Sequence, residues 1–142
     1  MRSELRISII INNYNYGGFL KQAIDSALSQ TLPAHEIIVV DDGSTDNSLS
    51  VLQDYNKEHI RVIAKANGGQ ASAFNAGFHA STGDWIWFLD ADDWLDTDAI
   101  EKVSIHARDG IAKIHATLRA ADEQGVELGY LVPYNPLSSG KV

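Results

Sequence analysis

Short apolar runs alternate with helix-forming stretches along most of this sequence. Four runs rich in Ile, Val or aromatic residues have the length of buried strands, namely residues 5–11, 35–40, 60–64 and 85–89. Between them, apolar residues recur at helical spacing in residues 19–28, 48–55 and 70–80. A strand–helix–strand order places successive strands in parallel, through right-handed crossovers. The sequence therefore predicts an α/β fold built on a doubly wound, mostly parallel sheet.

The pattern changes after the Asp109-Gly110 pair. A last helix is predicted at residues 97–107, and residues 111–120 and 126–132 are predicted to form the two strands of a C-terminal β-hairpin. Residues 133–142 are rich in Pro, Gly and Ser, which predicts a loose tail. We therefore expect an α/β domain over residues 1–110, followed by a hairpin and tail over residues 111–142.

Composition excludes several classes of partner. The net charge of −8 argues against nucleic acid or an anionic membrane as the main partner. There are no cysteines, so a metal must be bound by carboxylates, amides or histidines. The apolar run 7–11 is too short for a signal peptide or a membrane span, which predicts a cytoplasmic protein. Peripheral association with the inner face of a membrane is compatible with that expectation.

Polar side chains follow three of the four predicted strands. Asn12 and Tyr14 follow the first strand, Asp41 and Asp42 the second, and Asp90 the fourth. In an open parallel sheet, ligands bind beyond the carboxyl ends of the strands, where the strand order reverses. The sequence therefore predicts one ligand site at this edge of the sheet.

The acidic run that begins at Asp90 predicts a metal site formed by Asp90, Asp92 and Asp93. Carboxylates this close repel one another unless a cation or water intervenes. In an extended chain Asp90 and Asp92 lie roughly 7 Å apart, so one would bind the metal directly while the other holds a water or a substrate hydroxyl. Oxygen ligands favour Mg²⁺ or Mn²⁺, which suits a metal-bound diphosphate. Asp96 is expected to cap the following helix instead.

Three further features each have a ligand interpretation and a structural one. Asp42 can accept hydrogen bonds from a nucleobase or a ribose, or it can belong to a turn that precedes a helix. Tyr14 can stack on a base, or it can be an ordinary loop tyrosine. The segment 67–70 can present backbone amides to an anion at a helix N-terminus, or it can form a simple turn. Asn75, inside the predicted helix, needs a polar partner or solvent.

Five motifs occur together in one order. They are Ile9-Ile10-Ile11-Asn12-Asn13-Tyr14-Asn15, Ala27-Leu28-Ser29-Gln30-Thr31, Ile38-Val39-Val40-Asp41-Asp42-Gly43-Ser44-Thr45-Asp46, Asn67-Gly68-Gly69 with Phe74-Asn75-Ala76-Gly77, and Phe88-Leu89-Asp90-Ala91-Asp92-Asp93. The set resembles the family-2 inverting glycosyltransferases with the GT-A fold, whose nucleotide-binding half is Rossmann-like. The resemblance covers about residues 5–105. Each motif is weak alone, but the ordered set is specific.

The resemblance implies transfer of a sugar, with inversion, from a nucleotide-diphosphate donor to a saccharide or lipid-linked acceptor, assisted by Mn²⁺ or Mg²⁺. It also implies roles for individual residues. By position, the nucleoside would be held by Asn12, Tyr14 and Asp42 with Asp41 nearby, the ribose and diphosphate by Asn67, Gly69, Asn75 and Asp90, and the metal by Asp90, Asp92 and Asp93.

The sequence departs from the family pattern in two ways. Many members carry Arg where Phe74 stands. A cationic contact to the diphosphate from this helix is therefore not expected, and Lys65 is the suggested substitute. Members also continue into an acceptor-binding half that holds an acidic general base, which inverting transfer needs. Nothing after Asp109 resembles that base, and Glu123 and Glu127 belong to the predicted hairpin. We therefore expect an incomplete acceptor-side region in residues 111–142, no assignable catalytic base, and weak or absent transfer by this chain alone.

Two alternatives remain beside sugar transfer. One is a non-catalytic nucleotide-binding or interaction module of the same fold, in which an uncovered sheet edge promotes self-association. The other is a phosphotransferase or hydrolase with Asp90 as nucleophile and Asp92 as acid. It is disfavoured because such enzymes place this pair after the first strand, whereas here it follows the fourth.

Overall fold

The computed structural model describes residues 5–55, 57–107, 110–111, 113–114 and 118–132. The chain divides into two compact units, Met1–Ala107 and Arg108–Val142, close to the predicted boundary at residue 110. Each unit is described by itself. None of the helices in the described part of the chain has the length and apolarity needed to span a membrane.

The first unit is built on a parallel sheet of four strands. The strands are β1 (Ile7–Asn13), β2 (Glu36–Asp41), β3 (Arg61–Ala64) and β4 (Trp85–Asp90). They lie in the order β3-β2-β1-β4, and every neighbouring pair is parallel. The chain thus adds strands on one side of β1 and then crosses to the other side for β4. This arrangement confirms the predicted doubly wound α/β fold.

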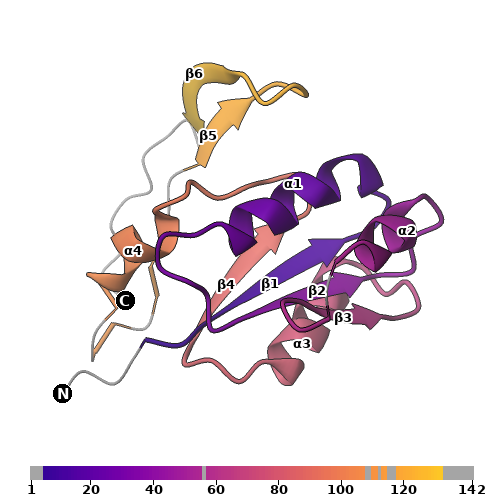
Figure 1. The fold of residues 1–142 in the computed structure, drawn as a ribbon, viewed down its shortest axis with the longest axis horizontal. Coiled ribbons are helices and arrows are strands. Elements are labelled where there is room, and N and C mark those ends of the chain that lie inside the picture. The colour runs from indigo at the N-terminus through magenta and orange to yellow at the C-terminus, as the bar shows by residue number, and fades with distance from the viewer. Residues whose placement is uncertain (1–4, 56, 108–109, 112, 115–117, 133–142) are drawn as a thin grey trace. The chain divides into compact units, whose positions relative to one another are not determined.

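Helices cover both faces of this sheet (Figure 1). They are α1 (Gly17–Leu28), α2 (Ser48–Gln53), α3 (Gln70–Ala80) and α4 (Ala99–Ser104). The alternation of side chains along β1 explains the two layers, because Ile9 and Ile11 pack in the same core as Leu20 and Ile24 of α1. Ile10 points to the opposite face and packs in the core that includes Ala73 of α3. β1 and β2 are buried on both faces, which accounts for their continuous apolar runs, whereas β3 and β4 are more exposed.

Three local predictions were wrong. Asn12 and Asn13 were expected in a turn, but both extend β1, where they pair with Asp90 and Asp41 respectively. The helix predicted at residues 97–107 is confined to α4 (Ala99–Ser104). The residue that precedes it is Asp98, so Asp96 does not occupy the capping position. The backbone N–H groups of Ala91 and Asp42 donate to the carbonyls of Asn12 and Asn13, and these hydrogen bonds to neighbouring segments keep β1 extended for two more residues.

The described part of the second unit contains an antiparallel hairpin, as predicted. It consists of β5 (Leu118–Ala121) and β6 (Glu127–Val132). The backbone N–H groups of Gln124 and Val126 donate to Asp122 Oδ1 and close the turn. The predicted strand 111–120 began too early. Of its described residues, 111, 113 and 114 are not in a strand. The predicted tail at residues 133–142 lies outside the described residues.

Two helical glycines give a matched test of the packing between α3 and β1. A Cβ atom added at Gly77 would lie 2.3 Å from Cγ2 of the fully buried Ile10, whereas one added at Gly18 of α1 meets nothing within 4 Å. We expect Gly77→Ala to lower the free energy of unfolding by about 1–3 kcal/mol, because Ile10 and α3 must move apart. Gly18→Ala is expected to leave stability unchanged or raise it by about 0.5–1 kcal/mol. Urea unfolding followed by circular dichroism measures both, and equal stabilities would contradict the close approach.

Candidate functional site

The point where the strand order reverses lies between β1 and β4. There Asn12 pairs with Asp90 across the two strands, at the carboxyl end of both. On the other side of β1, Asn13 pairs with Asp41 at the end of β2. Three strands therefore end in polar residues at one edge of the sheet, which is where a doubly wound fold binds its ligands.

A pocket of about 450 Å³ opens at this edge. It is lined by Asn12, Tyr14, Tyr16, Asp42, Asn67, Gly69, Gln70, Asp90, Ala91 and Asp92. Most of the residues singled out from the sequence thus line one pocket. Tyr16 and Ala91 were not predicted, and Gln70 was predicted only through its backbone, as part of the segment 67–70. Tyr16 lies two residues beyond Tyr14, and Gln70 follows the Gly-Gly pair, so both stood next to motifs that were recognised.

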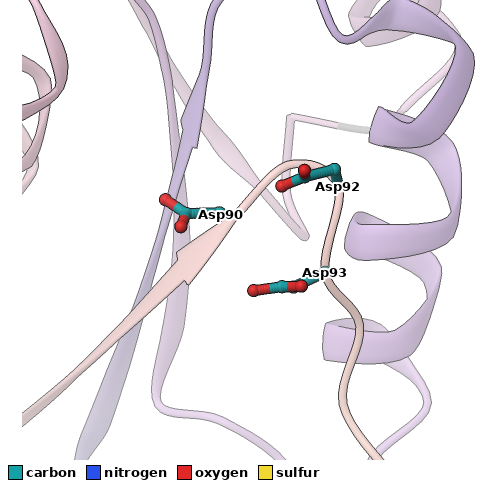
Figure 2. A group of neighbouring side chains, drawn as sticks. All are labelled: Asp90, Asp92 and Asp93. Carbon is teal, nitrogen blue, oxygen red and sulfur yellow. The ribbon is translucent and has the colours of Figure 1, made fainter. Parts of the chain in front are cut away.

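Asp90, Asp92 and Asp93 form a compact acidic cluster (Figure 2), and Asp90 and Asp92 of this cluster also line the pocket. One carboxylate oxygen from each residue lies within 4.8 Å of the others. The chain turns directly after β4, where the backbone N–H of Asp93 donates to the carbonyl of Asp90 at 3.0 Å. The predicted geometry was therefore wrong, since it assumed an extended chain with Asp90 and Asp92 far apart. The turn lets all three carboxylates reach one position.

The electrostatics of the cluster fit a divalent cation. Burial raises the pKa of the half-buried Asp93, and the neighbouring charges of Asp92 and Asp90 raise this pKa further. The contribution from the two neighbouring charges reflects repulsion among the three carboxylates, which a bound cation would relieve. Hard divalent cations prefer oxygen ligands of this kind. Asp93 belongs to the cluster although it does not line the pocket.

The neighbouring Asp42 carboxylate is buried and holds the loop that leads into α3. It accepts hydrogen bonds from Lys65 Nζ at 2.5 Å and from the backbone N–H groups of Gly68 and Gly69 at 3.0 and 2.8 Å. Burial alone would raise the pKa of Asp42, but these hydrogen bonds and the Lys65 charge hold the pKa below its ordinary value. Lys65, the suggested substitute for a cationic contact, is thus paired with Asp42, and it also donates to the carbonyl of Ala66.

Besides Asp93, two residues predicted to bind the nucleotide sugar, Asp41 and Asn75, do not line the pocket. Asp41 is buried, and its two carboxylate oxygens accept hydrogen bonds from Asn13 Nδ2 at 2.8 Å and from the Ser44 N–H at 3.1 Å. This places Asp41 where it orders the end of β1 and the following loop. Asn75 is exposed on α3 and does not line the pocket.

Asn12 presents an unused acceptor to the site. Its side chain lines the pocket, and its Oδ1 atom is buried without a hydrogen-bond partner among the described residues. A buried acceptor without a partner costs free energy, which a ligand donor would recover. Asn12 is therefore a candidate contact for a bound molecule.

Asn15 joins the loop after β1 to the loop after β2. It has a left-handed backbone with φ of 58°, and it is the one non-glycine residue with positive φ among the described residues. Its Oδ1 accepts the backbone N–H groups of Thr45 and Asp46 at 2.7 and 3.2 Å. Its own N–H donates to Ser44 Oγ at 2.9 Å. These bonds fix the segment that carries the pocket residues Tyr14 and Tyr16.

We expect Asn15→Ala to lower the free energy of unfolding by about 1–3 kcal/mol, since it removes the Oδ1 acceptor of two backbone N–H groups and keeps a strained backbone. Asn15→Gly relieves the backbone strain but not the lost hydrogen bonds, so its loss is expected to be smaller. Thermal unfolding of the two variants measures the difference. Wild-type stability in Asn15→Ala would show that the hydrogen bonds of Asn15 between the two loops do not stabilise the fold.

Comparison with known proteins finds that the chain is similar to glycosyltransferases. A family model described as glycosyl transferase family 2 matches residues 8–126. An uncharacterized glycosyltransferase from Nostoc sp. is 54% identical over 102 residues, which cover 70% of this chain and 32% of that protein. A chondroitin synthase from Pasteurella multocida is 42% identical over 97 residues, which cover 67% of this chain and 10% of that protein. The chain thus spans less than a third of the length of these relatives.

Solved structures share the fold. TarS 1-349 from S. aureus, in complex with UDP-GlcNAc, matches with a TM-score of 0.65 and 25% identity over 71% of this chain and 30% of that chain. The mannosyltransferase PcManGT from Pyrobaculum calidifontis, in complex with GDP-Man and Mn²⁺, matches with a TM-score of 0.60 and 24% identity. That match covers 66% of this chain and 29% of the mannosyltransferase, and it supports the fold alone.

Proposed function

The chain belongs to glycosyl transferase family 2, and on this premise we propose that it carries the donor and metal site of an enzyme that moves a sugar from a nucleotide diphosphate to an acceptor hydroxyl with inversion. One observation carries the proposal. A pocket of about 450 Å³ adjoins the acidic cluster Asp90, Asp92 and Asp93, at the edge where the strand order reverses. A nucleoside diphosphate needs both a concave site and a counter-charge for its phosphates.

The pocket residues suit the nucleoside end of such a donor. The exposed Tyr14 ring provides a flat surface for a base, and the unpaired Asn12 Oδ1 provides an acceptor for a base or ribose donor. Asp42 lines the same pocket, although its carboxylate already accepts three donors. We therefore assign Asp42 first to holding the loop after β3, with ligand contact as its second role.

The acidic cluster suits the diphosphate end through a divalent cation. Asp90, Asp92 and Asp93 would hold Mn²⁺ or Mg²⁺, which neutralises the charge that develops on the departing diphosphate. In support of a diphosphate ligand, TarS 1-349, which matches this chain at 25% identity, is in complex with UDP-GlcNAc. Asn67 and Gly69 line the pocket at the start of α3, where they are placed to border the ribose and phosphates.

The acceptor and the general base are proposed only by class. Inverting transfer requires a base that takes the proton of the acceptor hydroxyl, which we expect to belong to a saccharide or a lipid-linked sugar. We assign that base to none of the described residues, because Glu123 and Glu127 lie in the hairpin unit. Donor binding is therefore the part of the proposed function that this chain can be tested for.

A thermal-shift screen tests the proposal. UDP, GDP and ADP are each added to the chain with Mn²⁺ or with EDTA, and Mn²⁺ alone serves as the reference. We expect the melting temperature to rise most when one diphosphate and Mn²⁺ are present together, because a ligand that binds only the folded state stabilises it. A folded sample that shows no shift with any diphosphate and Mn²⁺ would refute the proposed function.

A further inference from the structure

Gln70 connects the start of α3 to the acidic cluster. It is the first residue of the helix, and its Nε2 donates a hydrogen bond of 2.8 Å to Asp90 Oδ1 at the end of β4. Both side chains line the same pocket. This contact therefore connects the N-terminus of α3 to the carboxyl end of β4.

The backbone that precedes Gln70 is held in place. The N–H groups of Gly68 and Gly69 both donate to the buried Asp42 carboxylate. Gly69 has a φ of 90°, a conformation that side-chain-bearing residues rarely adopt, and its carbonyl accepts the N–H of Ala73 in the first turn of α3. Gln70 therefore leaves a fixed point of the backbone, and its amide is directed at Asp90.

The acidic cluster needs such a contact. Asp90 shares its surroundings with Asp92 and Asp93, whose carboxylates lie within 4.8 Å and repel it. Without a partner, the Asp90 carboxylate would lower this repulsion by rotating away from them. A neutral amide donor opposes that rotation, and it occupies one carboxylate oxygen while leaving the other for a cation.

We propose that Gln70 is a positioning residue that holds Asp90 in the orientation needed to bind the divalent cation, an inference that rests on the proposed function. Partners of metal-binding carboxylates orient their ligands in this way, and their removal costs about 10–100-fold in metal affinity. The buried Asp42 carboxylate holds the loop that precedes Gln70, and Gln70 in turn contacts Asp90. Gln70 therefore connects Asp42 to the proposed metal site. The alternative is that the contact only secures the start of α3.

Gln70→Met separates the two roles. Methionine matches glutamine in length and helix propensity but has no donor, so it preserves packing and removes the hydrogen bond. Mn²⁺ binding to the full 142-residue chain is measured by electron paramagnetic resonance, which detects free Mn²⁺, at a fixed concentration of UDP or of the diphosphate chosen by the screen. The melting temperature in EDTA reports the metal-free fold. Gln53→Met, at the exposed end of α2, is the matched control.

The expected result is a Kd for Mn²⁺ about 10-fold higher in Gln70→Met, with the melting temperature in EDTA unchanged and with Gln53→Met equal to wild type. Equal Mn²⁺ affinity in Gln70→Met and wild type would overturn this inference alone. A lower melting temperature in EDTA with unchanged Mn²⁺ affinity would assign Gln70 a structural role instead. Absence of Mn²⁺ binding by the wild-type chain would overturn the proposed function, and this inference with it.

Discussion

Asp90→Ala is expected to abolish Mn²⁺-dependent nucleotide binding while leaving the fold intact. Asp90 supplies one of the three clustered oxygens, and it is also the residue that Gln70 holds. Its loss should cost more than the 10–100-fold typical of a supporting residue, so we expect the Kd for Mn²⁺ to rise by at least about 100-fold. The metal-free protein should not lose stability through the cluster, because removing the Asp90 carboxylate relieves its repulsion with Asp92 and Asp93.

Calorimetric titration of Mn²⁺ into the nucleotide-saturated chain measures this effect. Asp54→Ala is the matched control, because it changes the net charge equally at an exposed position after α2. It is expected to bind Mn²⁺ as the wild type does. Retained affinity in Asp90→Ala would remove the acidic cluster from the metal site. An equal loss in both variants would indicate a general effect of charge.

Asp42→Ala is expected to have the largest effect on stability. It leaves the N–H groups of Gly68 and Gly69 without their acceptor and Lys65 without its counter-charge. Breaking a buried ion pair from one side costs about 3–5 kcal/mol. The side chain of Lys65 is 23% exposed, so water offsets part of this cost and we expect a loss of about 3 kcal/mol. Because the loop leads to Gln70, Mn²⁺ binding should weaken as well.

Urea unfolding measures the loss, and Lys21→Met provides the comparison. Lys21 forms an exposed pair with Asp25 one helical turn away, with 71% of the lysine side chain exposed. Pairs of this kind contribute about 0.3–0.5 kcal/mol. Similar losses in Asp42→Ala and Lys21→Met would contradict the structural role of the buried carboxylate.

The pH dependence of Asp42 has a defined sign. Its pKa is lower in the folded state than its ordinary value of about 3.9, so the carboxylate contributes its full stabilisation above that pH and loses it as the pH falls toward the lower folded value. Glu36 and Asp46 also have lowered pKa values, so the wild-type curve alone does not isolate Asp42. The difference between wild type and Asp42→Asn does, and it should shrink below about pH 4.

The layered fold could be predicted because its determinants are local. Apolar runs of strand length alternate with helical periodicity, and the central strands β1 and β2, which are buried on both faces, are largely apolar. The edge that carries the site could also be predicted, because parallel strands end on one side of the sheet. Asn12 and Asp90 stand opposite each other for that reason.

The detailed geometry of the site could not be predicted, because it depends on contacts between distant segments. Asp41 and Asp42 are adjacent in sequence, yet Asp41 is bound to Asn13 across the sheet while Asp42 holds the loop before α3. The turn after Asp90 brings the acidic side chains together, whereas strand periodicity alone separates them. Gln70 joins the site only because Asp42 and Gly69 set the direction in which α3 begins.

Calorimetric titration of the chain with UDP, GDP and ADP, in Mn²⁺ and again in EDTA, tests the central claim most directly. We predict saturable binding of one of the three diphosphates that is at least about 10-fold tighter in Mn²⁺, because Asp90, Asp92 and Asp93 would hold a cation that supplies positive charge for the phosphates. Equal affinity in Mn²⁺ and EDTA, or no binding of any of the three diphosphates by the folded chain, would contradict the assignment of this pocket as a metal-dependent donor site.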